Sequence, residues 1–202
     1  MKPQRSVDLF APLPPWPFGA LRPHAYNLIA ADAPWKYEAY SERGEAKGAG
    51  AQYECLEAEE IAARFPVQDL AEPTCLLLCW ATWPLIDRQL ACVRAWGFEF
   101  KSIFVWQKVF PSGKPAIGTG YRVRSMCEPV IVATRGDPRH RAFPGFFAGI
   151  RREHSRKPEA FYELVSRCCP GLRRRADLFA RQSREGWDTW GNEATKFDEV
   201  AS

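Results

Sequence analysis

Short apolar runs that alternate with helical segments constrain this chain to an α/β fold. The runs with the length and composition of buried strands lie at residues 26–31, 74–80, 102–108, 129–134 and 175–181, with a further short candidate at 187–190. Helices are expected at residues 56–65, 84–96 and 158–169, and irregular segments at residues 36–53, 110–124 and 135–156. Strands that alternate with helices predict a sheet of largely parallel strands.

The composition fits one domain without membrane or metal. The chain has 202 residues, of which 46% are hydrophobic, and single domains usually contain about 100–200 residues. We expect an N-terminal Pro-rich arm at 1–25, a domain at 26–193 and a C-terminal tail at 194–202. The longest apolar stretch, residues 75–83, is much shorter than the roughly 18–20 residues of a membrane span. The odd number of cysteines, seven, favours reduced thiols in a cytoplasmic protein. The three histidines and the cysteines lack metal-ligand spacing, so no metal site is expected.

Positive charge is concentrated in one part of the chain. Residues 101–184 carry 18 Lys and Arg against 6 Asp and Glu, and the remaining residues carry 10 against 18. A basic segment of this strength is typical of a protein that binds a polyanion. An arginine-rich, solvated surface would give the same count, so charge alone leaves both interpretations open.

The first apolar run ends in a compact chemical motif, Asp32-Ala33-Pro34-Trp35. Pro34 pushes Ala33 toward extended geometry, which orients the Ala33 carbonyl. The Asp32 carboxylate and this carbonyl are two acceptors that together suit a planar NH2 group. Trp35 offers a flat surface for a base, where stacking is worth roughly 1–3 kcal/mol. The alternative is a structural turn in which Asp32 caps a backbone amide and Trp35 lies in the core.

Seven further segments follow this motif in a recognisable order. They are Cys79-Trp-Ala-Thr82, Ala95-Trp-Gly-Phe98, Val105-Trp-Gln-Lys108, Val132-Ala-Thr-Arg-Gly136, Arg152-Glu-His-Ser-Arg-Lys-Pro158, Leu178-Phe-Ala-Arg181 and Gly186-Trp-Asp-Thr-Trp-Gly-Asn-Glu193. Together, over residues 26–193, they resemble the MT-A70 family of adenine-N6 methyltransferases, most closely its bacterial and phage branch. The resemblance implies S-adenosylmethionine (SAM) as methyl donor. It also implies a permuted Rossmann-like α/β fold, with a mixed, mostly parallel sheet and helices on both faces. A Gly-x-Gly-x-x-Gly loop is not required, because SAM has no pyrophosphate.

The resemblance assigns the catalytic motif to Asp32, Ala33, Pro34 and Trp35. The family usually has Asp-Pro-Pro-Trp, so Ala33 is a departure. The Ala33 carbonyl is retained and only rigidity is lost, at a cost of about 0.4–1 kcal/mol. We therefore expect activity to survive the change.

The resemblance also assigns residues to the two ligands. Lys157 would pair with the methionine carboxylate of SAM, Arg181 would lie beside the cofactor, and Asn192 and Glu193 would hold the ribose hydroxyls. Ser183 stands where some relatives have a histidine contact. The cofactor set is thus Asp32, Lys157, Arg181, Ser183, Asn192 and Glu193, and the substrate set is Trp35, Tyr121, Arg122, Arg124 and Glu128. Without the resemblance, a surface lysine and a turn asparagine would be the ordinary interpretations of Lys157 and Asn192.

The predicted function is methyl transfer from SAM to the N6 amine of adenine in DNA. The base must be flipped out of the duplex or be unpaired to reach such a site. DNA is preferred because a compact chain without extra RNA-binding modules is similar to the bacterial branch. The alternatives are an RNA adenosine-N6 methyltransferase and a catalytically weak nucleic-acid-binding partner subunit.

Overall fold

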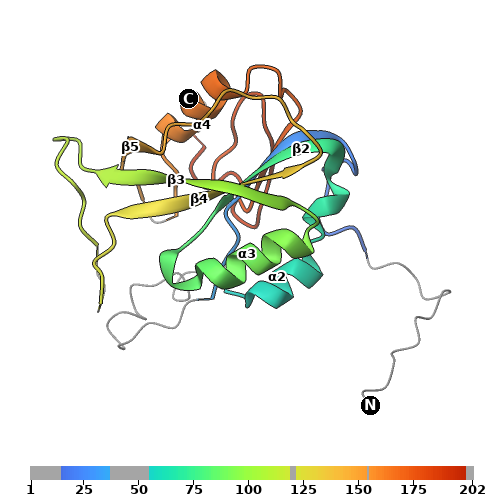
Figure 1. Ribbon diagram of the computed structural model, residues 1–202, viewed down its shortest axis with the longest axis horizontal. Coiled ribbons are helices and arrows are strands. Elements are labelled where there is room, and N and C mark those ends of the chain that lie inside the picture. The colour runs from blue at the N-terminus through green and yellow to red at the C-terminus, as the bar shows by residue number, and fades with distance from the viewer. Residues whose placement is uncertain (1–14, 37–54, 119–121, 154, 199–202) are drawn as a thin grey trace, which may run out of the picture.

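A twisted sheet runs through the middle of the protein (Figure 1). The computed structural model describes residues 15–36, 55–118, 122–153 and 155–198. Within these residues the sheet has seven strands in the order β5-β3-β4-β2-β1-β6-β7. Their bounds are β1 Tyr26–Ala31, β2 Ala71–Trp80, β3 Glu99–Val109, β4 Cys127–Arg135, β5 Phe146–Ile150, β6 Arg175–Leu178 and β7 Asp188–Trp190.

One strand opposes the direction of the others. β1 pairs in parallel with β2 and β6, β6 with β7, and β3 with β5. β4 is antiparallel to both β2 and β3. Antiparallel neighbours need only a hairpin connection, whereas parallel neighbours need a crossover. Since β4 alone runs against its neighbours in the described sheet, the predicted mixed, mostly parallel α/β sheet is confirmed.

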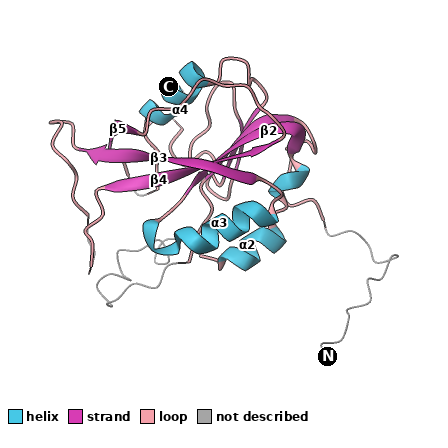
Figure 2. Cartoon of the chain, in the orientation of Figure 1, coloured by secondary structure: helices cyan, strands magenta, loops and turns pink. Residues whose placement is uncertain are grey.

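Helices cover both faces of the sheet (Figure 2). The helices are α2 Ala58–Arg64, α3 Ile86–Ala95 and α4 Glu159–Cys168, with 3-10 turns at Val67–Asp69 and Trp83–Leu85. Ile29 and Leu77 belong to the core on the α2/α3 face, whereas Leu28 and Leu76 belong to the core on the α4 face. Because successive side chains of a strand alternate between faces, covering both faces requires continuous apolar runs in β1 and β2.

Two expected elements differ from the structure. Residues 146–150 form strand β5, although the whole segment 135–156 was expected to be irregular. This strand lies at the edge of the sheet, and Phe146 is 65% exposed, so the segment lacks the strong apolar signature of a buried strand. β6 ends at Leu178 rather than at residue 181. Phe179 has a φ of 60°, and this left-handed backbone breaks the extended conformation.

The described parts of the expected arm and tail pack against the domain. Phe18 is fully buried and contacts the Trp190 ring edge-on, with the ring centroids 5.1 Å apart. The Phe197 amide donates to the Arg181 carbonyl at 3.1 Å. Residues 1–14, 37–54 and 199–202 lie outside the described residues, and the expected domain boundaries stay a prediction.

Two further properties bear on the sequence expectations. The seven cysteines are free thiols. No helix in the described part of the chain is long and apolar enough to cross a membrane.

Candidate active site

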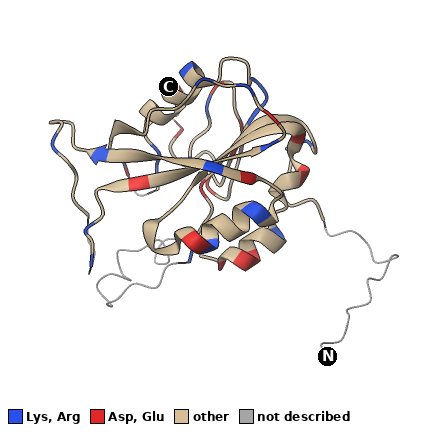
Figure 3. Ribbon diagram, in the orientation of Figure 1, with Lys and Arg blue, Asp and Glu red and all other residues tan. Residues whose placement is uncertain are grey.

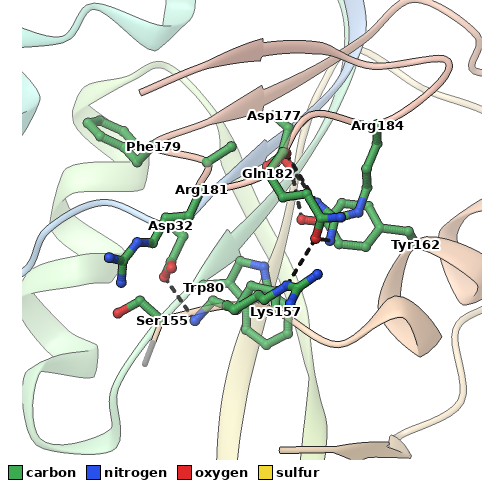
Figure 4. Close-up of a pocket in the computed structure, with 12 residues that line it drawn as sticks. Asp32, Trp80, Ser155, Lys157, Tyr162, Asp177, Phe179, Arg181, Gln182 and Arg184 are labelled. Carbon is green, nitrogen blue, oxygen red and sulfur yellow. Dashed lines mark hydrogen bonds and ion pairs between the residues drawn. The ribbon is translucent and has the colours of Figure 1, made fainter. Parts of the chain in front are cut away.

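The carboxyl ends of three neighbouring strands meet at one pocket. Asp32 directly follows β1, Trp80 ends β2 and Asp177 lies in β6. The Asp32 amide donates to the Leu178 carbonyl at 3.2 Å, which holds the start of the motif against β6. The pocket encloses about 300 Å³, part of it open to solvent. Its lining is drawn in Figure 4 and consists of Asp32, Trp80, Ser155, Arg156, Lys157, Tyr162, Asp177, Phe179, Ala180, Arg181, Gln182 and Arg184.

Left-handed backbone occurs at two lining residues of this pocket. Ser155 and Phe179 both have a φ of 60°, a conformation that costs a non-glycine residue about 1–3 kcal/mol. Such conformations persist only where the surrounding structure enforces them, and they cluster at functional sites. Phe179 turns the chain after β6, and Ser155 turns it just before Lys157, so both bends shape the pocket wall.

Lys157 connects two carboxylates from different strands. Its Nζ lies 3.1 Å from Asp32 Oδ1 and 3.0 Å from Glu128 Oε2 (Figure 4 shows the Asp32 contact). Glu128, on β4, also pairs with Lys108 on β3. The Lys157 ammonium lies 4.5 Å from the centroid of a Trp80 ring, and its side chain is only 12% exposed. Four charged groups of alternating sign therefore line up from β3 to β1.

The charges in this network affect each carboxylate differently. Burial raises the pKa of Asp32, although Lys157 opposes the shift. Burial would also raise the pKa of Glu128, but Lys157 and Lys108 together lower it to about 2. The pKa of Lys157 is raised by its two carboxylate partners despite burial. Glu128 and Lys157 are consequently charged at neutral pH.

The motif Asp32–Trp35 forms a tight turn in which Trp35 is buried. The Trp35 amide donates to the Ala33 carbonyl at 2.8 Å, which leaves that oxygen one further lone pair. The Trp35 indole N–H donates to the Trp80 carbonyl at 3.0 Å, and Trp35 is 7% exposed. The alternative of a core tryptophan therefore describes its position here, and its stacking role stays a prediction.

The expected ribose-binding residues lie beside Arg181. Arg181 pairs with Glu193, and its guanidinium is 5.3 Å from the Phe197 ring centroid. Gly191 permits this arrangement, because a Cβ there would come within 2.7 Å of the Ala180 carbonyl oxygen. Asn192 follows β7, which is parallel to β6 and ends at Trp190.

Ser183 makes different contacts from those expected of a cofactor residue. Its hydroxyl donates to Asp198 Oδ2 at 2.6 Å and its amide donates to Oδ1 at 2.7 Å. The structure therefore shows Ser183 fixing the segment around Asp198, and its expected cofactor role stays a prediction.

The expected substrate residues fall into two places. Glu128 joins the Lys157 network described above. Arg122 and Arg124 lie on the loop between β3 and β4, which projects past the end of the sheet (Figure 1). The charges that Figure 3 colours on this loop are Lys and Arg. Arg124 Nε donates to the Gly118 carbonyl at 3.3 Å. Tyr121 lies outside the described residues.

Three pocket residues were missed by the sequence analysis. Tyr162 donates its hydroxyl to Asp177 Oδ2 at 2.8 Å, and Arg184 Nη1 lies 3.9 Å from the same oxygen. The Arg184 guanidinium is 3.7 Å from the Tyr162 ring centroid. Burial raises the pKa of Asp177 to about 7, although Tyr162 and Arg184 oppose the shift. The available signal was an acidic residue inside the apolar run of β6, at its carboxyl end.

A comparison with known protein families tests the resemblance that the motifs indicated. The sequence model of the MT-A70 family matches residues 26–193, which make up most of the chain. The chain belongs to the MT-A70 family. MT-A70 methyltransferases modify the N6 amine of adenine and use SAM as methyl donor.

The chain spans a different share of the length of each relative in the MT-A70 family. It is 29% identical to the type II methyltransferase M.MunI of a Mycoplasma species, over 83% of this chain and 77% of that protein. It is 27% identical to the N6-methyladenosine RNA methyltransferase MTA1 of Pyricularia oryzae, over 86% of this chain but 48% of that protein. Identity to the human N(6)-adenosine-methyltransferase catalytic subunit METTL3 is 26%, over 58% of this chain and 21% of that protein.

The donor set of the pocket fits the cofactor of the MT-A70 family. SAM presents a carboxylate, an ammonium, a sulfonium and a ribose diol. The pocket supplies a buried ammonium from Lys157 and carboxylates from Asp32 and Asp177. It is also lined by Arg181, whose guanidinium pairs with Glu193. Opposite charges on ligand and wall are thus available for each charged group of the methionine portion. Among the described residues, no cluster of His, Cys, Asp and Glu has the makings of a metal site.

Proposed function

We propose that this protein transfers a methyl group from SAM to the N6 amine of adenine in DNA. The observation that carries the proposal is the position of Asp32. Its partly buried carboxylate opens onto the pocket and contacts Lys157, the residue expected to hold the cofactor's carboxylate. A target base held by Asp32 would therefore lie beside the bound cofactor. Bringing two reactants together in this way removes much of the entropic barrier to reaction.

The chemistry requires the motif to activate a poor nucleophile, because the lone pair of the N6 amine is delocalised into the adenine ring. In the proposed complex the amine donates one N–H to Asp32 and the other to the free lone pair of the Ala33 carbonyl. These two hydrogen bonds favour a pyramidal nitrogen whose lone pair points at the cofactor. When bound, SAM would supply an electrophilic methyl group, and its sulfur would keep the electron pair of the sulfur–methyl bond.

The same acceptors stabilise the product of attack. As the bond from nitrogen to the methyl carbon forms, the nitrogen gains positive charge. The Asp32 carboxylate and the Ala33 carbonyl dipole face this charge and stabilise it without having to reorganise. One of the two N–H protons then leaves the nitrogen. We assign its first acceptor to Asp32, whose burial raises its pKa and so favours proton uptake.

The remaining site residues bind and orient. Lys157 would hold the methionine carboxylate, and Arg181, Asn192 and Glu193 would surround the ribose. Arg122 and Arg124 project from a hairpin loop in which residues 110–126 include no Asp or Glu. Such a loop suits contact with phosphates, which position a nucleic acid without reading its sequence.

DNA is proposed because of the similarity to the type II methyltransferase, which is 29% identical over 188 residues. The similarity to the RNA enzymes keeps RNA adenosine as the second candidate substrate.

The test is transfer of labelled methyl groups from SAM to duplex DNA, single-stranded DNA and RNA in parallel. Asp32→Asn, which keeps the size of the side chain and removes its charge, is the matched control. We expect N6-methyladenine in DNA with the wild-type protein and none with the variant. Label in RNA alone would replace the proposal with the RNA alternative. Binding of SAM without transfer to any polymer would contradict enzymatic activity and support a partner subunit.

A further inference from the structure

A second pocket lies against the other end of the motif Asp32–Trp35 and has no role in the mechanism above. It holds about 190 Å³, part of it open to solvent. Its apolar wall consists of Trp35, Leu56, Ala58 and Leu85. These residues come from the segment after β1 and from the starts of α2 and α3, two helices that lie side by side on one face of the sheet (Figure 1).

The motif itself separates the two pockets. Asp32 lines the first pocket and Trp35 lines the second. Their Cα atoms are three residues apart in the chain, so they lie at most about 11 Å from each other. The Leu56 amide donates to the Pro34 carbonyl at 2.8 Å, and the Lys36 amide donates to the Leu56 carbonyl at 2.9 Å. Because the backbone is held in this way, the spacing of the two pockets is fixed.

Two cations share one carboxylate at the rim of the second pocket. Lys36 Nζ lies 3.2 Å from Glu57 Oε1, and Arg88 Nη1 lies 3.3 Å from Glu57 Oε2. All three residues line the pocket, so its lining carries one net positive charge. The Lys36 and Arg88 side chains are 51% and 56% exposed. Ion pairs at this exposure are weak, so the two cations can turn to an anion with several acceptor oxygens, such as a phosphate.

The floor of the second pocket contains a buried amide. Gln89 is fully buried, and its Oε1 accepts the Thr82 amide N–H at 2.9 Å. Its Nε2 lies 3.5 Å from Thr82 Oγ1, at the outer limit of a hydrogen bond. Among the described residues, one N–H of this amide is thus left for an acceptor on a ligand. An apolar wall with one amide donor suits a nucleobase, which has apolar faces and acceptor atoms along its edge.

We propose that the second pocket binds the nucleotide next to the target adenine. Its base lies against the apolar wall, and its phosphate lies between Lys36 and Arg88. The short distance between the pockets allows one strand to occupy both, because the target base at Asp32 and its neighbour are consecutive in the polymer. This inference rests on the proposed function and extends it to how the polymer is held beyond the target base.

The salt dependence of binding tests the phosphate contact. The probe is a labelled single-stranded DNA of about 12 nucleotides, thymines with one central adenine, whose affinity is followed by fluorescence anisotropy. In the double variant Lys36→Gln, Arg88→Gln one phosphate contact is lost. The slope of log affinity against log salt should then fall by about 0.7, and the affinity itself by about fivefold.

A matched double variant controls for the change in net charge. Lys101→Gln combined with Arg174→Gln also removes one lysine and one arginine, each paired with a glutamate, near the amino ends of β3 and β6. Because this end of the sheet is opposite the pocket, the slope should not change. An equal fall of the slope in both double variants would overturn the phosphate site.

Removal of a neighbouring base tests the apolar wall. In the polymer that the wild-type protein methylates, an abasic residue replaces the base on one side of the target adenine and then on the other. One of the two changes should lower kcat/KM by about fivefold to 100-fold, the range expected for a bound base. Ala58→Leu fills the pocket, so it should lower kcat/KM for the intact polymer and cause little further loss for the abasic one. Leu85→Trp, at a partly exposed position, is the second such variant if Ala58→Leu does not fold.

The outcomes separate this inference from the proposed function. If the wild-type protein methylates no polymer, the proposed function fails and the second pocket has no substrate to hold. If it methylates a polymer but tolerates an abasic residue on either side, the inference alone is overturned. An abasic loss that stays equally large in both pocket-filling variants would also overturn it, because the neighbouring base must then bind elsewhere.

Discussion

Replacing Lys157 with methionine measures how strongly the active-site charges depend on one another. The substitution keeps an unbranched chain over Trp80 and removes the ammonium that contacts Asp32 at 3.1 Å and Glu128 at 3.0 Å. Removing one member of a buried ion pair costs about 3–5 kcal/mol, because a charge is left buried without its partner. Glu128 keeps Lys108, and the two carboxylates are 22% and 23% exposed. We therefore expect the free energy of unfolding to fall by about 3 kcal/mol, the lower end of that range, near neutral pH.

The pH dependence of this loss has a defined sign. The pKa of Glu128 is lowered to about 2, so its contribution to stability is present above its unfolded pKa and disappears as the pH falls toward 2. Without Lys157 the pKa values of Asp32 and Glu128 both rise, and the carboxylates take up protons at higher pH. The difference between wild type and variant should therefore be largest near pH 7.5 and smaller near pH 4. Urea unfolding at the two pH values measures both free energies.

A double variant controls for the loss of packing. Asp32→Asn combined with Lys157→Met removes both members of one pair and leaves Glu128 paired with Lys108. It should recover at least about half of the lost stability, since no uncompensated carboxylate remains at Asp32. Surface ion pairs contribute less than about 1 kcal/mol. If Lys157→Met lowers the free energy of unfolding by less than this at both pH values, the network is not desolvated.

Three further substitutions test other features of the structure. Gly149→Ala would place a Cβ 2.7 Å from Trp106 Nε1, so the free energy of unfolding should fall by about 1–3 kcal/mol. A thermal melt measures this loss, and an unchanged melting temperature would contradict the packing. Trp35→Phe removes the indole N–H that donates to the buried Trp80 carbonyl at 3.0 Å and should lower the free energy of unfolding in urea by about 1–3 kcal/mol. A neutral result would mean that Trp35 is not held in the core. Burial raises the pKa of Asp177 to about 7, so the native state retains a proton that the unfolded chain releases, and wild-type stability should fall as the pH rises from about 4 to 7. Asp177→Asn should reduce this slope, and an identical slope would contradict the shift.

Local patterns in the sequence were enough to predict the α/β fold and the family. The apolar runs of β1 and β2 marked strands covered on both faces, and the mostly parallel sheet followed from their alternation with helices. It was also predictable that Asp32, which follows β1, would face a pocket, because ligands bind at the carboxyl ends of parallel strands. The family resemblance, carried by eight segments in order, is confirmed.

Other features depended on contacts between distant parts of the chain. Nothing near Trp35 in sequence shows that its indole N–H meets the Trp80 carbonyl, and nothing near Phe179 shows that β6 stops before it. β5 escaped prediction because an edge strand with exposed apolar residues has a weak local signature.

The amino-acid sequence by itself therefore determined the fold class and the family, and it placed Asp32 directly after the first strand. Apolar periodicity and backbone preferences act over a few residues, so they can be recognised locally. Only the tertiary structure decided that Lys157 is shared by Asp32 and Glu128, and that Asp177 faces the same pocket with Tyr162 on one oxygen. The charge state of a carboxylate depends on burial and on neighbouring charges, and both are set by strands that are distant in the chain and adjacent in the sheet.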